Sequence, residues 1–585
     1  MRSMLRKVVS EASQLAVMVL LSALGLAVHG KAQSSPPPRS SVETTIGTIS
    51  GKIVNENGEP MAGATLLVRR VDAFTTGRIS STDTEGSFLI NNLDPGLYTI
   101  LPNAPAYTAA PSDPDAPTYY RIGDSVRIEV IRGGVITGTV TNGAGEPVIA
   151  VRVRAIMTRD SEGQVPRMAS FGLVENLTDD RGIYRIYGLA PGTYVVSAGG
   201  SSSQSFQLNP YDSDIPTYAP SSTRDNAVEV TVASGEDSNV DIRYRGEPGY
   251  TISGKVKVVS TNGASITLAP AGGSFMPGSG AFQMPGNRGF AFNGIGDGDY
   301  DLVAQEVTTG QTSAIPQMAF SEARRVTVKG ASVTGIELIP KPLASVSGRV
   351  LVEPSKAPEC QGKRPLLLTE TLVQFRRHEK DIKKDESLMP RIMGTSASPD
   401  TTGAFLLRNL LPGRYQFEPR FYARYWYLRS ITSKNAPANM AQKPVAAPTM
   451  DAAANWMVVK SGEQLTNLTI TLAEGAASLR GRLASAEPPG GLSLYLVPAE
   501  ADKAQDVLRF FVTEITADGT FALSNLPPGR YLVLAHAAGP ETATLAKLRL
   551  PESATARTKL RRTAETQKSE IDLKPCQNLT DYQIK

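Results

Sequence analysis

Short stretches of alternating apolar and polar residues recur along most of the chain. Residues 228–232, 326–328 and 468–472 are examples, and each stretch lies close to a turn that contains glycine. A period of two is typical of strands with one buried face, because successive side chains of a strand point to opposite sides. The pattern therefore predicts an all-β chain of short, half-exposed antiparallel strands.

A turn of fixed layout also recurs. Four copies pair a glycine with a tyrosine twelve residues later, and the glycine of a Pro-Gly dipeptide precedes that tyrosine by two residues. A fifth, degenerate copy has Asp297 in place of the proline. Proline fixes φ and glycine accepts positive φ, which predicts a tight turn, and the tyrosine is expected to pack its ring inward while its hydroxyl reaches a backbone group. The predicted turn residues are Gly96 and Tyr98, Gly192 and Tyr194, Gly298 and Tyr300, Gly413 and Tyr415, and Gly529 and Tyr531.

Each turn is preceded by a predicted strand that contains Gly-x-aliphatic. These opening glycines are Gly51, Gly138, Gly254, Gly348 and Gly481, at intervals of 87 to 133 residues. Such intervals exceed a solenoid unit of about 20–50 residues and suit one β-sandwich of about 100 residues per repeat. We predict five tandem β-sandwich domains, named repeat 1 (47–132), repeat 2 (133–247), repeat 3 (248–341, degenerate), repeat 4 (342–475) and repeat 5 (476–576). Residues 543–568 are expected to form a short helix and a loop, and residues 577–585 a C-terminal tail.

The first residues have the pattern of an export signal. A basic start at Arg2, Arg6 and Lys7 leads to an apolar run of 14 residues at 15–28, followed by small residues before Gln33. We predict a signal peptide at 1–32 and a Pro/Ser linker at 33–46. An uncleaved anchor is the alternative, although the run is shorter than the roughly 20 residues of a spanning helix. The mature protein is then exported to the periplasm, cell surface or medium, and no membrane span is expected after signal cleavage.

The repeated pattern G-x-[IV]…D-x-x-G-x-[FY]…L-x-P-G-x-Y resembles the carboxypeptidase regulatory-like domain, whose fold is prealbumin-like and Ig-like. The resemblance extends over nearly all of residues 47–575 and is loose in repeat 3. It implies antiparallel β-sandwiches in a bacterial secreted or cell-envelope protein. The same broad fold is grouped with carbohydrate-binding-like and pilin-type modules, but a shared fold does not establish function.

Catalytic chemistry has few candidates. After the signal, the histidines are His378 and His536, and neither has a glutamate three residues further on, as a carboxypeptidase-type zinc site would need. H-E-x-x-H, Walker and G-x-S-x-G motifs are absent. The acidic turns at 179–180 and 212–214 could hold calcium weakly, with ordinary solvated turns as the favoured alternative. We therefore predict no catalytic residue, metal or cofactor, and a protein that is not an enzyme.

Two further features concern binding. Cys360 and Cys576 are the two cysteines, and an even count in an oxidising compartment suggests a disulfide, with two free thiols as the alternative. Tyr422, Tyr425, Trp426 and Tyr427 form the densest aromatic run and could stack on a ligand, although packing in a core is favoured.

Charge excludes one class of partner. The chain carries 60 Lys and Arg against 56 Asp and Glu, a net charge of +4, which argues against a dedicated nucleic-acid binder. We predict a non-enzymatic exported scaffold or protein-interaction array whose partners are envelope or extracellular proteins. Polysaccharide binding is the alternative function.

Overall fold

A computed structural model describes most of the chain after residue 46. The described residues are 47–72, 77–110, 118–164, 173–201, 209–257, 263–271, 280–283, 286, 289–308, 316–382, 396–434, 449–484, 492–537 and 553–584. Contacts divide the chain into two units, Met1–Thr44 and Thr45–Lys585, and all described residues belong to the second. The predicted signal peptide (1–32) and linker (33–46) lie outside the described residues.

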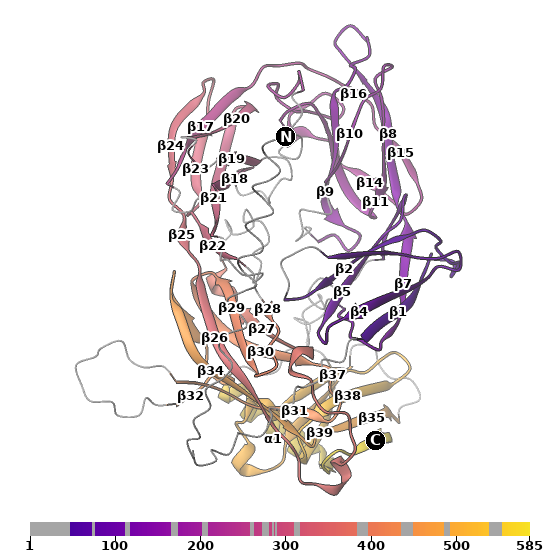
Figure 1. Cartoon of the computed structure of the whole chain (residues 1–585), viewed down its shortest axis with the longest axis vertical. Helices are drawn as coiled ribbons and strands as arrows, with labels where there is room; N and C mark the ends of the chain where they lie inside the picture. The colour runs from indigo at the N-terminus through magenta and orange to yellow at the C-terminus, as the bar shows by residue number, and fades with distance from the viewer. Residues whose placement is uncertain are drawn as a thin grey trace, which may run out of the picture. The chain divides into compact units, whose positions relative to one another are not determined.

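The described residues form ten β-sheets, two for each predicted repeat (Figure 1). Repeat 1 has sheets of order β4-β1-β7-β6 and β3-β2-β5, and repeat 2 has β11-β8-β15 with β16, and β10-β9-β12-β13 with β14. The strands of repeat 1 are β1 Gly47–Val54, β2 Thr65–Arg70, β3 Arg78–Ser81, β4 Ser87–Leu93, β5 Tyr98–Asn103, β6 Tyr107–Ala109 and β7 Ser125–Arg132. Those of repeat 2 are β8 Gly134–Thr141, β9 Arg152–Asp160, β10 Leu173–Leu177, β11 Ile183–Leu189, β12 Gly192–Ala198, β13 Thr217–Tyr218, β14 Val230–Val232, β15 Asp237–Asn239 and β16 Ile242–Arg243.

Repeats 3 to 5 follow the same plan. Their sheets are β20-β17-β24 and β19-β18-β21-β22-β25 with β23, then β29-β26-β34-β31-β32 and β28-β27-β30-β33, then β38-β35-β41 and β37-β36-β39-β40. The strands of repeat 3 are β17 Tyr250–Val256, β18 Ala264–Pro270, β19 Gly280–Gln283, β20 Phe290–Ile295, β21 Gly298–Thr308, β22 Gln317–Phe320, β23 Arg324–Val328, β24 Val333–Leu338 and β25 Lys341–Pro342. Those of repeat 4 are β26 Ala344–Glu353, β27 Thr371–Arg377, β28 Ser396–Ala397, β29 Ala404–Leu410, β30 Gly413–Phe421, β31 Trp426–Lys434, β32 Thr449–Asp451, β33 Met457–Val459 and β34 Gln464–Glu474. Those of repeat 5 are β35 Ala477–Leu483, β36 Leu492–Pro498, β37 Phe511–Glu514, β38 Thr520–Leu526, β39 Gly529–Ala537, β40 Glu570–Leu573 and β41 Asn578–Ile584.

Helical structure is sparse among the described residues. The α-helix α1 spans Ala554–Gln567, within the segment predicted to contain a helix, and Ser553 caps it by accepting a hydrogen bond from the amide of Ala556. Single 3-10 turns are η1 Arg224–Asn226, η2 Pro358–Cys360, η3 Leu368–Glu370, η4 Glu379–Asp381, η6 Ala501–Lys503 and η7 Val507–Arg509. Within the described part of the chain, no helix is long and apolar enough to cross a membrane.

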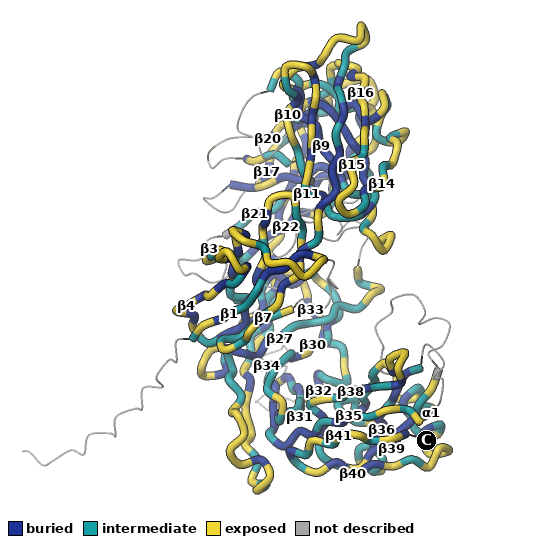
Figure 2. The backbone as a smooth tube through the Cα atoms, turned by 90° about the vertical axis from the view of Figure 1, so that its right-hand side faces the viewer, coloured by how far each residue is buried: buried dark blue, intermediate teal, exposed yellow. Residues whose placement is uncertain are grey.

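Each pair of sheets encloses a buried apolar cluster of its own, which makes the described chain a series of β-sandwiches. Buried and exposed residues alternate along the strands, as the period of two predicts (Figure 2). The clusters draw residues from both sheets of each repeat. Fully buried examples are Ile49 and Leu66 in repeat 1, Ile136 and Val153 in repeat 2, Ile252 and Ile266 in repeat 3, Val346 and Val373 in repeat 4, and Leu479 and Leu494 in repeat 5.

The opening strand of each repeat has a parallel partner, whereas the alternation suggested antiparallel strands throughout. The opening strands β1, β8, β17, β26 and β35 pair antiparallel on one side. On the other side they pair parallel with a late part of the repeat, which is β7, β15 with β16, β24, β34 and β41, respectively. The reason is the route of the chain. In repeats 2 to 5, the strand that pairs parallel with the opening strand and the strand before it join different sheets, as β33 pairs with β30 and β34 with β26. The glycine-containing turn between them is therefore a crossover between sheets, not a hairpin.

The parallel pair explains the opening glycines. A Cβ atom built on Gly51, Gly138, Gly254, Gly348 or Gly481 would lie 2.0–2.2 Å from a carbonyl oxygen of the adjacent parallel strand. In repeats 1, 4 and 5 the ring of Phe88, Phe405 or Phe521 also packs onto the glycine. Any side chain at this position would separate two hydrogen-bonded strands.

The C-terminal boundary predicted for repeat 5 is wrong. Residues 577–585 were expected to be a tail, but Asn578–Ile584 forms β41, the closing strand that pairs parallel with β35. The expected closing strand at 571–573 is instead β40, which pairs with β39 in the other sheet. The sequence of β41 does not reveal this strand, because its two aliphatic residues, Leu579 and Ile584, have four other residues between them and show no period of two.

The five tyrosines of the recurring turn form one conserved arrangement within the chain. The hydroxyls of these corner tyrosines donate to the carbonyl oxygen four residues earlier, at 2.6–3.0 Å. The acceptors are the carbonyls of Asp94, Ala190, Gly296, Leu411 and Pro527. Repeat 3 keeps this bond although it lacks the Pro-Gly dipeptide, so the tyrosine itself defines the corner.

The position of the positive φ angle differs from the prediction. Gly96 and Gly192 are not among the positive-φ glycines, although Gly298, Gly413 and Gly529 are. All five repeats instead place a left-handed residue six positions before the corner tyrosine. These bulge residues are Asn92, Gly188, Gly294, Asn409 and Asn525, with φ between 57° and 74°. They lie where an extra residue interrupts the pairing with the opening strand, and asparagine and glycine tolerate that conformation best.

We expect the corner tyrosines to make the protein sensitive to alkali. Burial raises the pKa of Tyr98, Tyr194 and Tyr531, and raises the pKa of Tyr300 to about 12, from 10.0. The unfolded chain therefore loses these protons first, so their contribution to stability is complete below pH 10 and is lost as pH rises towards 12. The urea midpoint should fall between pH 9 and pH 12, and tyrosinate absorbance at 295 nm should rise together with unfolding. The same midpoint at both pH values would contradict this expectation.

Candidate functional site: the joints between repeats

The bulge residues of repeats 2 to 5 lie where each repeat meets the preceding one. Beside each of these four, a linker amide of the later repeat donates to a carbonyl of the segment that follows the corner-tyrosine strand of the earlier repeat. These bonds run from Gly133 to Ala106, Gly249 to Ser213, Leu343 to Met318 and Ala476 to Tyr425, at 2.8–3.0 Å. We call each combination of linker, bulge residue and segment a joint, numbered by the repeats that it connects.

In the joint of repeats 3 and 4, a side chain supplies the contact. Asn409 is 1% exposed, and its Oδ1 accepts from the amide of Met318 at 2.8 Å while its Nδ2 donates to the carbonyl of Pro316 at 3.0 Å. The short strands β22 and β25 pair here, and Leu411 of repeat 4 packs on the apolar cluster around Phe320. Polar and apolar contacts therefore fix this joint together.

The joint of repeats 4 and 5 repeats this use of asparagine. Nδ2 of Asn525 donates to the carbonyls of Ala423 and Trp426, at 2.8 and 2.7 Å. A disulfide joins Cys360 of repeat 4 to Cys576 of repeat 5, across 216 residues of sequence. The amide of Cys576 also donates to the carbonyl of Gly475, at 3.0 Å. This joint thus has a covalent bond in addition to its hydrogen bonds.

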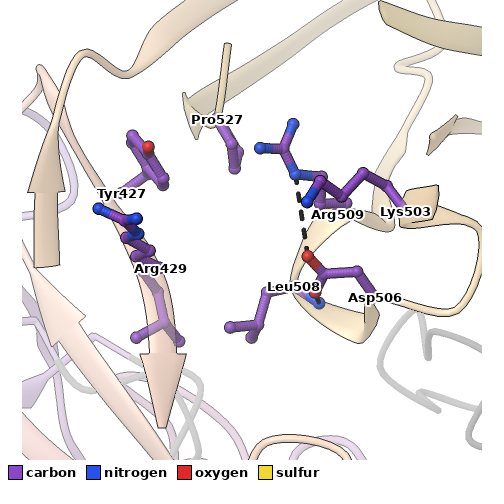
Figure 3. A pocket seen from close by; sticks show the side chains of 8 residues that line it. Tyr427, Arg429, Lys503, Asp506, Leu508, Arg509 and Pro527 are labelled. Atoms are coloured by element: carbon purple, nitrogen blue, oxygen red, sulfur yellow. Dashed lines mark hydrogen bonds and ion pairs between the residues drawn. The ribbon is translucent and has the colours of Figure 1, made fainter. Parts of the chain in front are cut away.

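The aromatic run of repeat 4 borders the same joint. Trp426 is 5% exposed and belongs to the core of repeat 4, which favours core packing over ligand stacking for this ring. Tyr425 is half-buried beneath the ammonium group of Lys363, and Tyr422 is half-buried between β30 and β31. Tyr427 points away from the core, into a pocket of about 360 Å³ (Figure 3). The four rings therefore do not form one exposed platform.

That pocket is polar and its charged groups are paired. Arg429, Lys503 and Arg509 line it with Asp506. Arg509 donates to the carbonyl of Pro528 at 2.8 Å and lies 3.9 Å from Asp506 (Figure 3). Arg429 pairs with Glu353, and Lys503 with Asp502. With each cation already beside an acceptor, the pocket has no surplus charge to attract an anion.

The joint of repeats 2 and 3 has a glycine at the bulge. A Cβ atom on Gly294 would lie 2.5 Å from the carbonyl oxygen of Asp214, so the two backbones touch. The amide of Ile215 donates to the carbonyl of Glu247 at 2.8 Å. A cavity of about 580 Å³ lies beside this joint. Its lining includes Ile156, Tyr218, Arg154 and Arg224 from repeat 2, and Phe292, Asp299 and Tyr300 from repeat 3.

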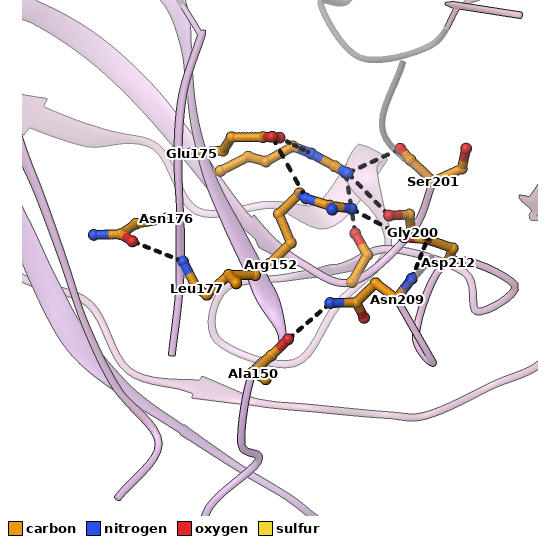
Figure 4. A network of polar contacts seen from close by, with 11 residues as sticks. Ala150, Arg152, Glu175, Asn176, Leu177, Gly200, Ser201, Asn209 and Asp212 are labelled. Atoms are coloured by element: carbon orange, nitrogen blue, oxygen red, sulfur yellow. Dashed lines mark hydrogen bonds and ion pairs between the residues drawn. The ribbon is translucent and has the colours of Figure 1, made fainter. Parts of the chain in front are cut away.

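A buried pair of arginines supports the loop used in this joint (Figure 4). Arg152 and Arg154, both 5% exposed, lie on one face of β9 and share the carboxylate of Glu175, at 3.4 and 3.2 Å. Arg154 also donates to the carbonyls of Gly199, Gly200 and Ser201, while Arg152 binds Asp212 at 2.9 Å. Burial lowers the pKa of Arg154, and these acceptors offset that cost. The network holds residues 199–201 and Asp212 against the sheet.

The titratable groups considered in the sequence have structural contacts. Asp212 binds Arg152, Asp214 accepts from the hydroxyl of Tyr244 at 2.7 Å, and Asp179 accepts from the amides of Arg181 and Ile183. Backbone hydrogen bonds lower the pKa of Asp179. The ring of His378 packs against Trp456, and His536 is exposed on β39. Within the described part of the chain, no three His, Cys, Asp or Glu residues form a metal-binding group.

The joints were not predicted from the sequence. A signal was present, because Asn or Gly stands six residues before every corner tyrosine. Such a residue indicates a left-handed backbone, but it does not reveal that the neighbouring repeat packs there. The contact joins residues about 90–100 positions apart, as between Asn409 and Met318 or Asn525 and Ala423.

Comparison with known proteins identifies one region. A family model of the carboxypeptidase regulatory-like domain matches residues 48–116, within repeat 1. No curated protein matches the sequence.

Three solved structures show a distant likeness. The Bacillus anthracis TIE protein is 13% identical over 51% of this chain and 51% of its own, with a TM-score of 0.14. GBS52, the minor pilin of Streptococcus agalactiae, is 14% identical over 34% and 96%, with a TM-score of 0.18. The shaft pilin SpaA of Lactobacillus rhamnosus GG is 9% identical over 34% and 98%, with a TM-score of 0.17. The chain thus spans about half of the TIE protein, and TM-scores this low carry no argument about function.

Proposed function

We propose that the protein is a non-enzymatic exported scaffold, in which five sandwich domains hold protein-binding faces at fixed spacing. Its partners are envelope or extracellular proteins, and its location is the periplasm, cell surface or medium. We further propose that the five domains have the boundaries given for repeats 1 to 5, with repeat 5 extended through β41, and that all five share the regulatory-like fold matched at 48–116.

The observation that carries this proposal is the recurring joint. Independent domains on flexible linkers would share few contacts, and relative motion would be the default. Here, four linkers bond to the preceding repeat, and two buried or half-buried asparagines add side-chain bonds. These polar contacts restrict the orientation of each repeat relative to the next. They therefore set the spacing between the outer faces of the repeats, which is the property that a scaffold needs.

The alternative function, polysaccharide binding, depended on an exposed aromatic platform in repeat 4. Its candidate platform was the run Tyr422, Tyr425, Trp426 and Tyr427, but Trp426 is in the core and the other three rings lie in separate environments. A sugar-binding platform needs exposed rings on one face. We therefore propose protein contact rather than polysaccharide binding.

The proposal predicts that breaking a joint loosens the scaffold without unfolding it. Asn409→Gly keeps the left-handed backbone but removes both side-chain bonds to repeat 3. Spin labels at the exposed positions Lys329 and Val458 should give one narrow distance distribution in the parent protein and a broader one in the variant. Asn92→Gly is the matched control, because Asn92 has the same conformation but is exposed. Equal widths in the parent protein and the Asn409→Gly variant would contradict a fixed spacing.

A pull-down of the full-length protein from cell envelope and culture fluid tests the partner class. Recovery of specific proteins, reduced by Asn409→Gly and unchanged by Asn92→Gly, is the expected result. Recovery of polysaccharide without protein would overturn the proposal.

A further inference from the structure

The outer face of the sheet β3-β2-β5 in repeat 1 carries a partly exposed apolar row. Leu67 of β2 lies opposite Ile79 of β3 and Leu101 of β5. Their neighbours Leu66, Val68 and Ile100 face the core, so the row faces outward. Ile79 is 78% exposed and Leu101 is 39% exposed. We call Leu67, Ile79 and Leu101 the apolar row.

Other repeats of the same chain cover this face. The residue three positions after the corner tyrosine is Leu101 in repeat 1 and Ser197, Val303 and Leu534 in repeats 2, 3 and 5, where it is at most 1% exposed. Polypeptide with a large apolar side chain provides the cover in each case. The covering residues are Tyr218 in repeat 2, Met318 and Phe320 in repeat 3, and Phe510 with Leu560 and Ala564 of α1 in repeat 5.

Repeat 4 shows the other solution for this face. Its equivalent residues include Gln374, Gln416 and Glu418, and Glu418 is exposed. The face that meets water in repeat 4 is polar, whereas the buried face of repeat 5 pairs Leu534 with Tyr495 and that of repeat 3 pairs Val303 with Thr267. The buried face of repeat 2 instead carries Arg154 opposite Ser197. Repeat 1 is apolar at all three positions of the row but is more exposed than the faces of repeats 2, 3 and 5, which is typical of a surface that meets a partner.

Charge narrows the choice of partner. The three strands contain Arg69, Arg70 and Arg78 but no Asp or Glu. Arg70 is paired with Asp72, whereas Arg69 is exposed on the same face as the apolar row. Two copies of this face would place arginines against each other, which disfavours self-association. A partner that carries a carboxylate next to an apolar side chain would complement both Arg69 and the apolar row.

We propose that the apolar row and Arg69 form a docking surface for an acidic-apolar segment of another protein. That segment presents an aromatic or large aliphatic side chain to Leu67, Ile79 and Leu101, and an Asp or Glu to Arg69. The inference rests on the scaffold function proposed above, and adds which side chains one of its protein partners presents to repeat 1. Truncating a central apolar anchor of such an interface weakens binding by about tenfold or more.

Site-specific photo-crosslinking of the full-length protein in its own cells tests this assignment. A photoreactive residue replaces Ile79, or in the matched control Leu89, which is 56% exposed on the other sheet of repeat 1. Position 79 should crosslink to one protein, and the captured peptide should carry an aromatic or large aliphatic residue within about one helical turn or four strand residues of an Asp or Glu. Leu101→Asp and Arg69→Glu should each reduce the yield about tenfold, whereas Arg69→Lys should retain most of it.

The other outcomes overturn the inference. Equal yields at positions 79 and 89, capture of a second copy of this chain, or a captured peptide without a carboxylate would each reject the docking surface. Specific crosslinks at position 89 but none at 79 would reject it while leaving the scaffold function intact. If neither position 79 nor position 89 crosslinks to another protein, and the pull-down also recovers none, the proposed scaffold function itself is rejected.

Discussion

The variant Gly138→Ala should destabilise repeat 2 by about 3 kcal/mol or more, a large effect for one methyl group. The new Cβ would lie 2.0 Å from the carbonyl oxygen of Val240 and 2.6 Å from its carbon. Both contacts are with backbone, so no side chain can move aside. The same carbonyl accepts a buried hydrogen bond from the hydroxyl of Tyr184 at 2.6 Å, which the strand would have to break as it shifts.

Hydrogen exchange in repeat 2 measures this effect locally, which matters because a multidomain chain need not unfold in one step. Amides of β8, β11 and β16 should lose protection in Gly138→Ala, while those of repeat 5 keep it. Gly143→Ala is the matched control, because a Cβ atom there meets nothing within 4 Å and the residue lacks a positive φ. It should change stability by less than about 0.5 kcal/mol. Similar protection in the two variants would refute the proposed close approach.

Removing the disulfide between Cys360 and Cys576 should cost up to about 5 kcal/mol in the chain-entropy account, because the bond closes a loop of over 200 residues. The loss should fall on repeats 4 and 5, which the bond connects across their joint. The double variant Cys360→Ser/Cys576→Ser should therefore unfold at lower guanidinium concentration than the parent protein. Chemical reduction of the parent protein should shift its midpoint in the same direction.

Thiol labelling checks the bond independently of stability. The denatured, unreduced parent protein should show no reactive thiol, and the single variant Cys360→Ser should show one, from Cys576. Two labelled thiols in the parent protein would end the idea of a bridge. A midpoint that reduction leaves unchanged would show that the bond adds nothing to the joint.

Much of the fold could be predicted from the sequence, because its signals are local. The alternation predicted strands, and the spacing of glycine and tyrosine predicted a turn in which the tyrosine hydroxyl reaches a backbone group. In the structure, Tyr98, Tyr194, Tyr300, Tyr415 and Tyr531 each donate to the carbonyl four residues earlier. Each of these features lies within about a dozen residues of chain, where backbone geometry leaves few choices. The match to the carboxypeptidase regulatory-like domain at 48–116 covers the first copy of this pattern.

The candidate site could not be predicted in the same way. The sequence placed Asn409 and Asn525 before a turn, but their partners Met318 and Ala423 belong to the preceding repeat. Likewise, the sequence allowed Trp426 either to pack in a core, as favoured, or to stack on a ligand, and the fold places it in the core of repeat 4. Exposure and contact depend on which surfaces pack together, and a single strand's pattern does not contain that information.

By itself, the sequence determined a chain of β-sandwiches with a repeated tyrosine corner. The tertiary structure decided which strand closes each repeat, why the opening glycines exclude any side chain, and where one repeat contacts the next. It also decided that Leu101 of repeat 1 is 39% exposed while Leu534 of repeat 5 is fully buried. The physical reason is range: a period of two records which face of a strand is apolar, whereas only the packed chain decides what, if anything, lies against that face.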